Sequence, residues 1–162
     1  MTKGVCVFDI DQTLTCINEC SIEQVDYMKR AVDLCHSNDF EIAINTARPP
    51  QHDILFNIPL DLRKKLEYVP VYNRPVDGPA VELQKLENMH QISNNFHVSL
   101  QNTILIDDLE STCSLLQDFN IPSILVTERN GITEKEYNIL NTMICNMSEK
   151  EVHHSYINRI YS

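Results

Sequence analysis

The sequence predicts an α/β fold built around an open parallel sheet, with helices on both faces in three layers. Apolar patterns of two kinds alternate along its 162 residues: short runs rich in β-branched residues, and longer segments in which apolar residues recur every three or four positions. Two of the short runs, VCVF and ILI, are continuous rather than alternating, which is typical of central strands buried on both faces. Because strands and helices alternate, we expect right-handed crossovers between parallel strands.

The expected strands are residues 5–8, 40–45, 68–72, 103–106 and 123–127. Helices are expected at 22–35, 79–92, 109–119 and 133–147, with short ones at 51–57 and 60–66 and a final one after Ser148. Ser21 and Gln24 have the pattern of a capping box, as do Thr133 and Glu136. No linker or internal repeat interrupts the pattern, so we expect one domain over residues 1–162.

Acidic residues outnumber basic ones 23 to 13, which gives a formal net charge of −10. A strongly acidic surface repels phosphate backbones and anionic lipids, so generic nucleic-acid or membrane binding is disfavoured. No apolar run approaches the roughly twenty residues of a membrane helix, and the apolar start of the chain is too short for a signal peptide. We therefore expect a cytoplasmic protein.

Six cysteines are scattered along the chain. Cys16 and Cys20 lie four residues apart, but no second pair of Cys or His residues stands at zinc-finger spacing. Structural zinc is therefore disfavoured, and we expect reduced thiols, most of them buried.

Acidic residues follow the first predicted strand directly, in the segment VFDIDQTLT. Asp9 and Asp11 come at its end, with Thr13 two residues further on. Ligands bind at the carboxyl ends of strands in open parallel sheets, and two desolvated carboxylates there need a counter-charge. Mg²⁺ suits such a site because it is a hard ion that prefers carboxylate, water and phosphate oxygens. The alternative interpretation is an ordinary turn, since aspartate is common in turns.

A second acidic pair, Asp107 and Asp108, follows the continuous run ILI at the fourth strand. One acidic pair at a strand end can be a helix cap, but two clusters at the ends of two buried strands indicate a shared cation. Thr46 follows the second strand, where its hydroxyl and nearby backbone N–H groups could hold a phosphoryl oxygen. A purely structural role for Thr46 is the alternative.

Lys85 shares a helical face with Val81, Met89 and Ile92, which directs it inward. A buried ammonium group is costly unless it is paired. Its partner could be Glu82 or a backbone carbonyl. The interpretation that we prefer is that Lys85 reaches the acidic site and its phosphate.

Arg48, Arg74 and His52 are candidates for contacting the leaving group of a substrate. Arg48 follows Thr46 closely, and Arg74 lies beyond the third predicted strand. Arginine binds phosphate or carboxylate through two parallel hydrogen bonds. The alternative for each candidate is a solvated loop side chain.

Together, these motifs resemble those of the haloacid dehalogenase superfamily of phosphohydrolases. The matching residues are Asp9-Ile10-Asp11-Gln12-Thr13, Thr46, Lys85 and Asp107-Asp108, in the same order and spacing over nearly the whole chain. The resemblance implies a Rossmann-like core with strand order 5-4-1-2-3. It also implies that Asp9 attacks phosphorus to form an aspartyl-phosphate, while Asp11 protonates the leaving oxygen and later deprotonates the hydrolytic water.

The resemblance further implies a bound Mg²⁺ and two residues that bind the phosphoryl group. The metal would be held by the Asp9 side chain, the Asp11 backbone carbonyl and Asp108, with Asp107 adjacent or one shell further out. Thr46 and Lys85 would bind the phosphoryl oxygens, and Lys85 would also orient the nucleophile.

An acid at Asp11 points to a phosphatase, because ion pumps, phosphonate-cleaving members and dehalogenases of this superfamily lack an acid there. The intervals from Thr13 to the first helix and from Thr46 to Lys85 leave no room for a sizeable cap. Capless members act on large substrates that cover the site, or they oligomerise so that a neighbour closes it. A homo-oligomer is therefore one expectation.

Three functions remain open. The preferred hypothesis is a Mg²⁺-dependent phosphomonoester hydrolase that acts on a small phosphorylated metabolite or nucleotide. A polynucleotide-end or phosphoprotein phosphatase is the alternative, although the net charge and the lack of a basic stripe disfavour a nucleic-acid strand. A catalytically silent binding protein with this fold is disfavoured because every expected catalytic side chain is present.

Overall fold

The computed structural model describes residues 1–161, in which strands and helices alternate along the chain. The elements are β1 (Gly4–Phe8), α1 (Ile22–Ser37), β2 (Phe40–Asn45), α2 (Leu60–Lys65), β3 (Val71–Tyr72), α3 (Val81–Phe96), a 3₁₀ turn (Leu100–Asn102), β4 (Thr103–Asp107), α4 (Glu110–Asp118), β5 (Ser123–Leu125) and α5 (Glu134–Tyr161).

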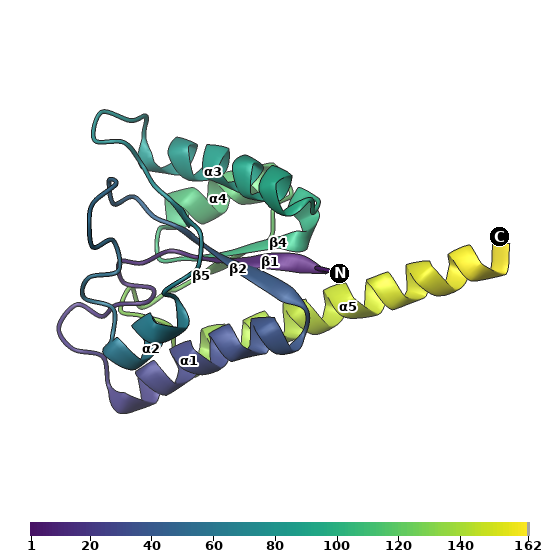
Figure 1. Cartoon of the computed structure of the whole chain (residues 1–162), viewed down its shortest axis with the longest axis horizontal. Coiled ribbons are helices and arrows are strands. Elements are labelled where there is room, and N and C mark those ends of the chain that lie inside the picture. Colours follow the sequence, from purple (N-terminus) through teal and green to yellow (C-terminus); the bar gives the residue numbers. More distant parts are fainter. Residues whose placement is uncertain (162) are drawn as a thin grey trace.

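The strands form one five-stranded parallel sheet in the order β3-β2-β1-β4-β5, which is the predicted order read from the other edge. Helices α3 and α4 cover one face, and α1, α2 and α5 cover the other (Figure 1). The predicted three-layer, Rossmann-like fold is therefore confirmed. No sizeable cap is present in the part of the chain that the structure describes.

The central strand β1 contributes to both halves of the core. Cys6 and Phe8 pack toward α1, α2 and α5, whereas Val5 and Val7 pack toward α3 and α4. Burial on both faces explains why this strand reads as a continuous apolar run. It also places the residue after β1 in the middle of the sheet edge, between the ends of β2 and β4.

The predicted capping box of α1 is confirmed. The hydroxyl of Ser21 accepts a hydrogen bond of 3.1 Å from the backbone N–H of Gln24, and the Gln24 side chain accepts one of 3.2 Å from the N–H of Ser21. These two bonds fix where the helix begins after the long connection from β1.

The short helix predicted at 51–57 is wrong, because residues 52–57 form turns. The carbonyls of Ile54 and Phe56 each accept a hydrogen bond of 2.8 Å from Nη1 of Arg48. Asn57 has a φ of +68°, which lies outside the right-handed helical region. The arginine thus satisfies carbonyls that a helical ladder would otherwise use.

Two strands are shorter than predicted. β3 begins only at Val71, because Pro70 before it has no N–H to donate to a neighbouring strand. β5 ends at Leu125: the N–H of Val126 still donates to the carbonyl of Asp107 at 2.8 Å, and the chain turns from Thr127 onward.

The carboxyl-terminal region is one helix, α5, rather than a helix to 147 followed by a second one after Ser148. No glycine or proline lies within this stretch to end it. Its first half packs against α1 and β5, and its end extends away from the sheet (Figure 1). The capping box predicted for Thr133 and Glu136 forms only in part. The N–H of Thr133 donates to the Glu136 carboxylate at 2.9 Å, but the Thr133 hydroxyl also donates to that carboxylate, at 2.6 Å, in place of accepting from the Glu136 N–H.

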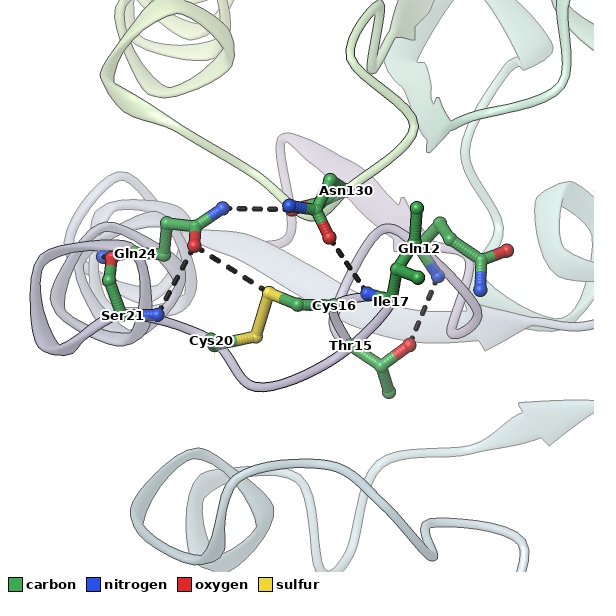
Figure 2. The surroundings of a disulfide bond; sticks show 8 residues. All are labelled: Gln12, Thr15, Cys16, Ile17, Cys20, Ser21, Gln24 and Asn130. Atoms are coloured by element: carbon green, nitrogen blue, oxygen red, sulfur yellow. Dashed lines mark hydrogen bonds between the residues drawn. A yellow bond between two sulfur atoms is a disulfide. The ribbon is translucent and has the colours of Figure 1, made fainter.

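The expectation that every cysteine is a reduced thiol is wrong for one pair: Cys16 and Cys20 form a disulfide. Their four-residue spacing lies in a loop that brings the two Cα atoms to 5.1 Å. The loop is tied to the β5–α5 connection, because Asn130 Oδ1 accepts a bond of 2.7 Å from the N–H of Ile17 (Figure 2). The free cysteines are Cys6, Cys35 and Cys113, which are buried, and Cys145, which is exposed.

Among residues 1–161, the structure contains no helix that has both the length and the apolar character needed to cross a bilayer.

Candidate active site

Three carboxylates meet at the carboxyl-terminal edge of the sheet. Asp9 follows β1, Asp107 is the last residue of β4 and Asp108 comes next. All three are buried, and each offers an oxygen atom within 4.8 Å of the others. The parallel pairing of β1 with β4 produces this cluster, because it aligns the ends of the two strands.

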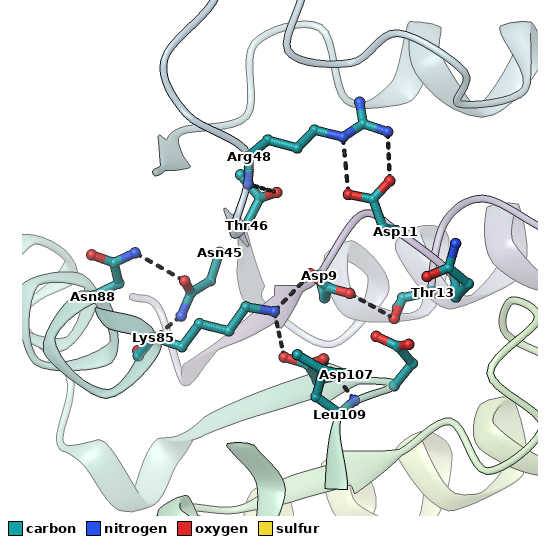
Figure 3. A network of polar contacts seen from close by, with 12 residues as sticks. Asp9, Asp11, Thr13, Asn45, Thr46, Arg48, Lys85, Asn88, Asp107 and Leu109 are labelled. Carbon is teal, nitrogen blue, oxygen red and sulfur yellow. Dashed lines mark hydrogen bonds and ion pairs between the residues drawn. The ribbon is translucent and has the colours of Figure 1, made fainter. Parts of the chain in front are cut away.

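Lys85 lies on helix α3, and its side chain reaches the cluster of aspartates. Its side chain is 1% exposed, and its ammonium nitrogen lies 2.7 Å from Asp9 Oδ1 and 2.5 Å from Asp107 Oδ2 (Figure 3). Its partners are therefore these two aspartates rather than Glu82, the alternative that the sequence left open. Thr13 completes the surroundings of Asp9, because its hydroxyl donates to Asp9 Oδ2 at 3.2 Å.

The charges in this cluster do not balance. Burial raises the pKa of the Asp9 carboxyl to about 8, even though the Lys85 ammonium opposes the shift, and burial also raises the pKa of Asp107. Burial alone would lower the pKa of Lys85, but the two aspartates outweigh it and raise that pKa. Among the described residues, Lys85 and Arg129 are the cations that pair with the three carboxylates, and Arg129 Nε lies 3.2 Å from Asp108 Oδ2.

This donor set fits a divalent cation. The three aspartates supply only hard oxygen ligands, and when all three are ionised the two cations beside them leave one excess negative charge. Mg²⁺ is bound in proteins by one or two carboxylates together with water and phosphate oxygens. A buried carboxylate with a raised pKa is also a group that a cation would stabilise in its ionised form.

Asp11 lies apart from this cluster and is held by Arg48. The guanidinium group donates from Nε and Nη2 to the two oxygens of Asp11, at 3.1 and 2.9 Å (Figure 3). Its Nη1 binds the carbonyls of Ile54 and Phe56, and its carbon lies 4.9 Å from the centre of the Phe56 ring. The donors of Arg48 are therefore directed at Asp11 and at the 52–57 turns. The side chain of Asp11 is not part of the group of three aspartates that could hold a metal ion.

A cavity of about 580 Å³ opens beside Asp11 and Arg48. It is lined by Asp11, Gln12, Thr15, Cys16, Ile17, Asn18, Glu19, Cys20, Val25, Arg48, Asn57, Pro59 and Leu60. The disulfide loop forms one wall and the start of α2 forms another.

The remaining sequence-predicted residues lie in different settings. Thr46 is fully buried at the end of β2, and its hydroxyl accepts a bond of 3.1 Å from the N–H of Arg48. Arg74 donates to the carbonyls of Pro79 and Gly78 in its own loop, at 2.7 and 3.1 Å. His52 is exposed in the 52–57 turns. The substrate-binding roles of these residues stay predictions.

Two features of the site were not anticipated from the sequence. Arg129 follows β5, and its Nε donates to Asp108 Oδ2. Its position after a strand that ends at this edge of the sheet could have indicated that it lies near the acidic cluster. Three buried amides around Lys85, from Asn45, Gln84 and Asn88, form a hydrogen-bonded group that has no recognisable sequence pattern.

Comparison with solved structures shows the class of fold to which this geometry belongs. A phosphoserine phosphatase, described as a phospho-aspartyl intermediate analogue, is 13% identical and aligns with a TM-score of 0.50 over 83% of this chain and 94% of that one. An uncharacterised protein from Corynebacterium glutamicum is 10% identical, with a TM-score of 0.56 over 90% and 94%. A chain of the Pnkp1/Rnl/Hen1 complex is 14% identical, with a TM-score of 0.54 over 82% of this chain and 47% of that one.

These likenesses confirm the predicted haloacid dehalogenase-like fold. No family model matches the sequence. No curated protein matches it either.

Proposed function

We propose that this protein is a Mg²⁺-dependent phosphomonoester hydrolase that works through an aspartyl-phosphate on Asp9. The observation that carries the proposal is the buried cluster of Asp9, Asp107 and Asp108 with the ammonium of Lys85 inserted between two of them. Charge neutralisation in a site that excludes water is the main requirement of phosphoryl transfer.

The metal would be held by Asp9 and Asp108, with Asp107 adjacent and the backbone carbonyl of Asp11 as a further ligand. When bound, Mg²⁺ supplies positive charge to the phosphoryl oxygens and helps to orient them. Asp9 is kept in one orientation by Lys85 on Oδ1 and Thr13 on Oδ2. A carboxylate fixed in this way loses little orientational freedom when it attacks phosphorus.

In the first step, an oxygen of Asp9 forms a bond to phosphorus while the bond from phosphorus to the leaving oxygen breaks. When Asp11 is protonated it keeps only one of its two hydrogen bonds from Arg48, and its other oxygen gives the proton to the leaving oxygen. As a carboxylate, Asp11 then removes a proton from the water that attacks phosphorus and releases Asp9. Lys85 and Thr46 neutralise and hold the phosphoryl oxygens. Arg48 positions Asp11 beside the cavity that would receive the leaving group.

Replacing Arg48 with alanine should impair substrates with poor leaving groups most. An alkyl phosphate depends on proton donation by Asp11, so we expect kcat/KM to fall about 100-fold, the lower end of the usual contribution of a general acid. The good leaving group of p-nitrophenyl phosphate needs little protonation, so its kcat/KM should change much less. Steady-state kinetics of Arg48→Ala and Asp11→Asn with both substrates measure this, and an equal loss for both substrates would show that Arg48 does not act through Asp11.

The contribution of Asp9 to the stability of the metal-free protein should fall as pH rises from about 4 to about 8. The folded-state pKa of Asp9, about 8, lies above its ordinary value of 3.8, so the native state binds this proton more tightly than the unfolded state. This contribution therefore decreases with pH between the two values. Mg²⁺ at about 100 times its Kd should add about 2.7 kcal/mol, roughly 5–10 °C in Tm.

Thermal unfolding at pH 5.5 and pH 8, with and without MgCl₂, measures this effect. We expect the larger Mg²⁺-dependent rise in Tm at pH 8, where the metal need not displace a proton from Asp9. Asp9→Asn is the matched variant and should show a much smaller rise. A rise that is equal at both pH values, or unchanged in Asp9→Asn, would contradict a metal site at Asp9.

For the substrate, we propose a small phosphorylated metabolite or nucleotide. The cavity beside Asp11 has room for such a leaving group, and the net charge of −10 works against a nucleic-acid strand. The likeness to a chain of the Pnkp1/Rnl/Hen1 RNA repair complex keeps a polynucleotide-end phosphatase as the second candidate. A phosphoprotein substrate would also have access to a site without a cap.

A panel of substrates separates these candidates. Sugar phosphates, nucleoside monophosphates, 3′-phosphorylated oligonucleotides and phosphopeptides would be compared by kcat/KM with Mg²⁺ present. We expect the small molecules to be preferred, and turnover of oligonucleotides alone would overturn that preference. Light scattering of the same sample would test whether a second subunit covers the open site.

A further inference from the structure

Three amide side chains are buried beside Lys85, between α3 and the sheet. Asn45 is the last residue of β2, and Gln84 and Asn88 lie one turn apart on α3. Asn45 and Asn88 are 0% and 2% exposed, and Gln84 is also buried. Figure 3 shows Asn45 beside Lys85, with Asn88 hydrogen-bonded to Asn45.

These amides bind one another and the backbone. Gln84 Nε2 donates to Asn88 Oδ1 at 2.9 Å, and Asn88 Nδ2 donates to Asn45 Oδ1 and to the carbonyl of Asn73, both at 3.0 Å. Asn45 Nδ2 in turn donates to the carbonyl of Lys85 at 3.0 Å. The group therefore connects the end of β2, the segment after β3, and the backbone of the lysine itself.

The space between α3 and the sheet does not need polar side chains to fill it. The same side of the sheet is filled by an apolar cluster that includes Val7, Ala43, Met89 and Ile92. Apolar packing resists separation of a helix from a sheet but gives little resistance to a small slide of one along the other. Hydrogen bonds have preferred lengths and directions, so a fully satisfied buried network fixes one relative position.

We propose that Asn45 and Asn88 are positioning residues that hold the backbone of Lys85 where its ammonium group bridges Asp9 and Asp107. The inference rests on the proposed function, because it assigns the amides a role in the same reaction. Asn45 acts directly, through the carbonyl of Lys85. Asn88 acts through Asn45 and through the carbonyl of Asn73.

The decisive variant replaces both residues with apolar ones, Asn45→Val with Asn88→Leu. Removing one amide leaves its partner buried without a hydrogen bond, which destabilises the protein, whereas replacing both by apolar groups of similar shape can be nearly neutral. The double variant still leaves the Gln84 amide and the carbonyls of Asn73 and Lys85 without these partners, so we expect a modest fall in Tm, and kcat is measured per folded molecule. Its kcat for an aryl phosphate should fall about 10- to 100-fold, since a displacement of about 1 Å can cost 100-fold in rate.

Ile92→Ala is the matched control, because it weakens the packing of the same helix without touching the amides. It should lower Tm and leave kcat per folded molecule within about twofold. A double variant with normal kcat, or an Ile92→Ala variant with the same loss of kcat, would show that the amides serve packing alone.

A double-mutant cycle tests whether the amides act through Lys85. In a Lys85→Met background, the double amide variant should lower kcat by less than about twofold, because the group that it positions is absent. An equal fold-loss in both backgrounds would overturn the inference.

The proposed function is tested separately by wild-type turnover and its loss in Asp9→Asn. If the wild type hydrolyses no phosphomonoester, the proposed function fails. A crystal structure of the double variant then still tests whether the amides fix the position of Lys85. Lys85 Nζ still within hydrogen-bond distance of both aspartates in that structure would overturn the positioning role.

Discussion

Asp9→Asn is expected to lower kcat for phosphomonoester hydrolysis by at least about 10⁴-fold, the largest loss of any single substitution. An amide oxygen is a poor nucleophile, and loss of a covalent nucleophile is comparable to loss of the whole catalytic group. Asparagine has nearly the same shape and removes a buried negative charge. In the absence of metal, the variant should therefore fold at least as stably as the wild type. The raised pKa of Asp9 in the wild type shows that its ionised form is costly in the native state.

The measurement is single-turnover and steady-state hydrolysis of p-nitrophenyl phosphate with Mg²⁺, with circular dichroism to confirm folding. Asp118→Asn, an exposed residue at the end of α4, makes the same chemical change far from the cluster and should keep full activity. Wild-type turnover that survives in Asp9→Asn would refute Asp9 as the nucleophile. No turnover in the wild type would favour a silent binding protein.

Lys85→Met should lower both stability and activity. It leaves Asp9 and Asp107 buried without their cation, and breaking a buried ion pair by removing one partner costs about 3–5 kcal/mol. The loss should be larger at pH 8 than at pH 5.5, since protonation of the carboxylates relieves it. For activity, we expect kcat to fall about 10²- to 10³-fold, as when one preorganised donor to the transition state is removed.

Urea unfolding at both pH values, with and without Mg²⁺, measures the stability effect. Mg²⁺ should restore part of the lost stability, because it supplies another cation to the same carboxylates. Lys64→Met, at an exposed position of α2, controls for the loss of a positive charge from an acidic protein. A Lys85→Met variant as stable as Lys64→Met at pH 8 without metal would contradict the electrostatic account of the cluster.

The sequence predicts the sheet and the main residues of the cluster because both depend on local patterns. Continuous apolar runs mark β1 and β4, and the acids that follow them must meet where two adjacent parallel strands end. The inward direction of Lys85 follows from helical spacing alone. These predictions need only periodicity and the rule that parallel strands end at a common edge.

Other features depend on contacts between distant segments. Two carbonyls of the 52–57 turns accept hydrogen bonds from Arg48, whose guanidinium group also binds Asp11, so the shape of these turns depends on a contact with another segment. The disulfide depends on how the loop bends between Cys16 and Cys20. Asn45 and Asn88 lie far apart in sequence, and their residue types are too common to reveal a shared buried network.

A crystal structure of the protein soaked with Mg²⁺ and beryllium fluoride, a mimic of the phosphoryl group, tests the central claim most directly. We expect one Mg²⁺ bound to oxygens of Asp9 and Asp108 at about 2.0–2.1 Å, with beryllium fluoride attached to Asp9. An absence of Mg²⁺ between these aspartates, or beryllium fluoride attached to another side chain, would contradict it.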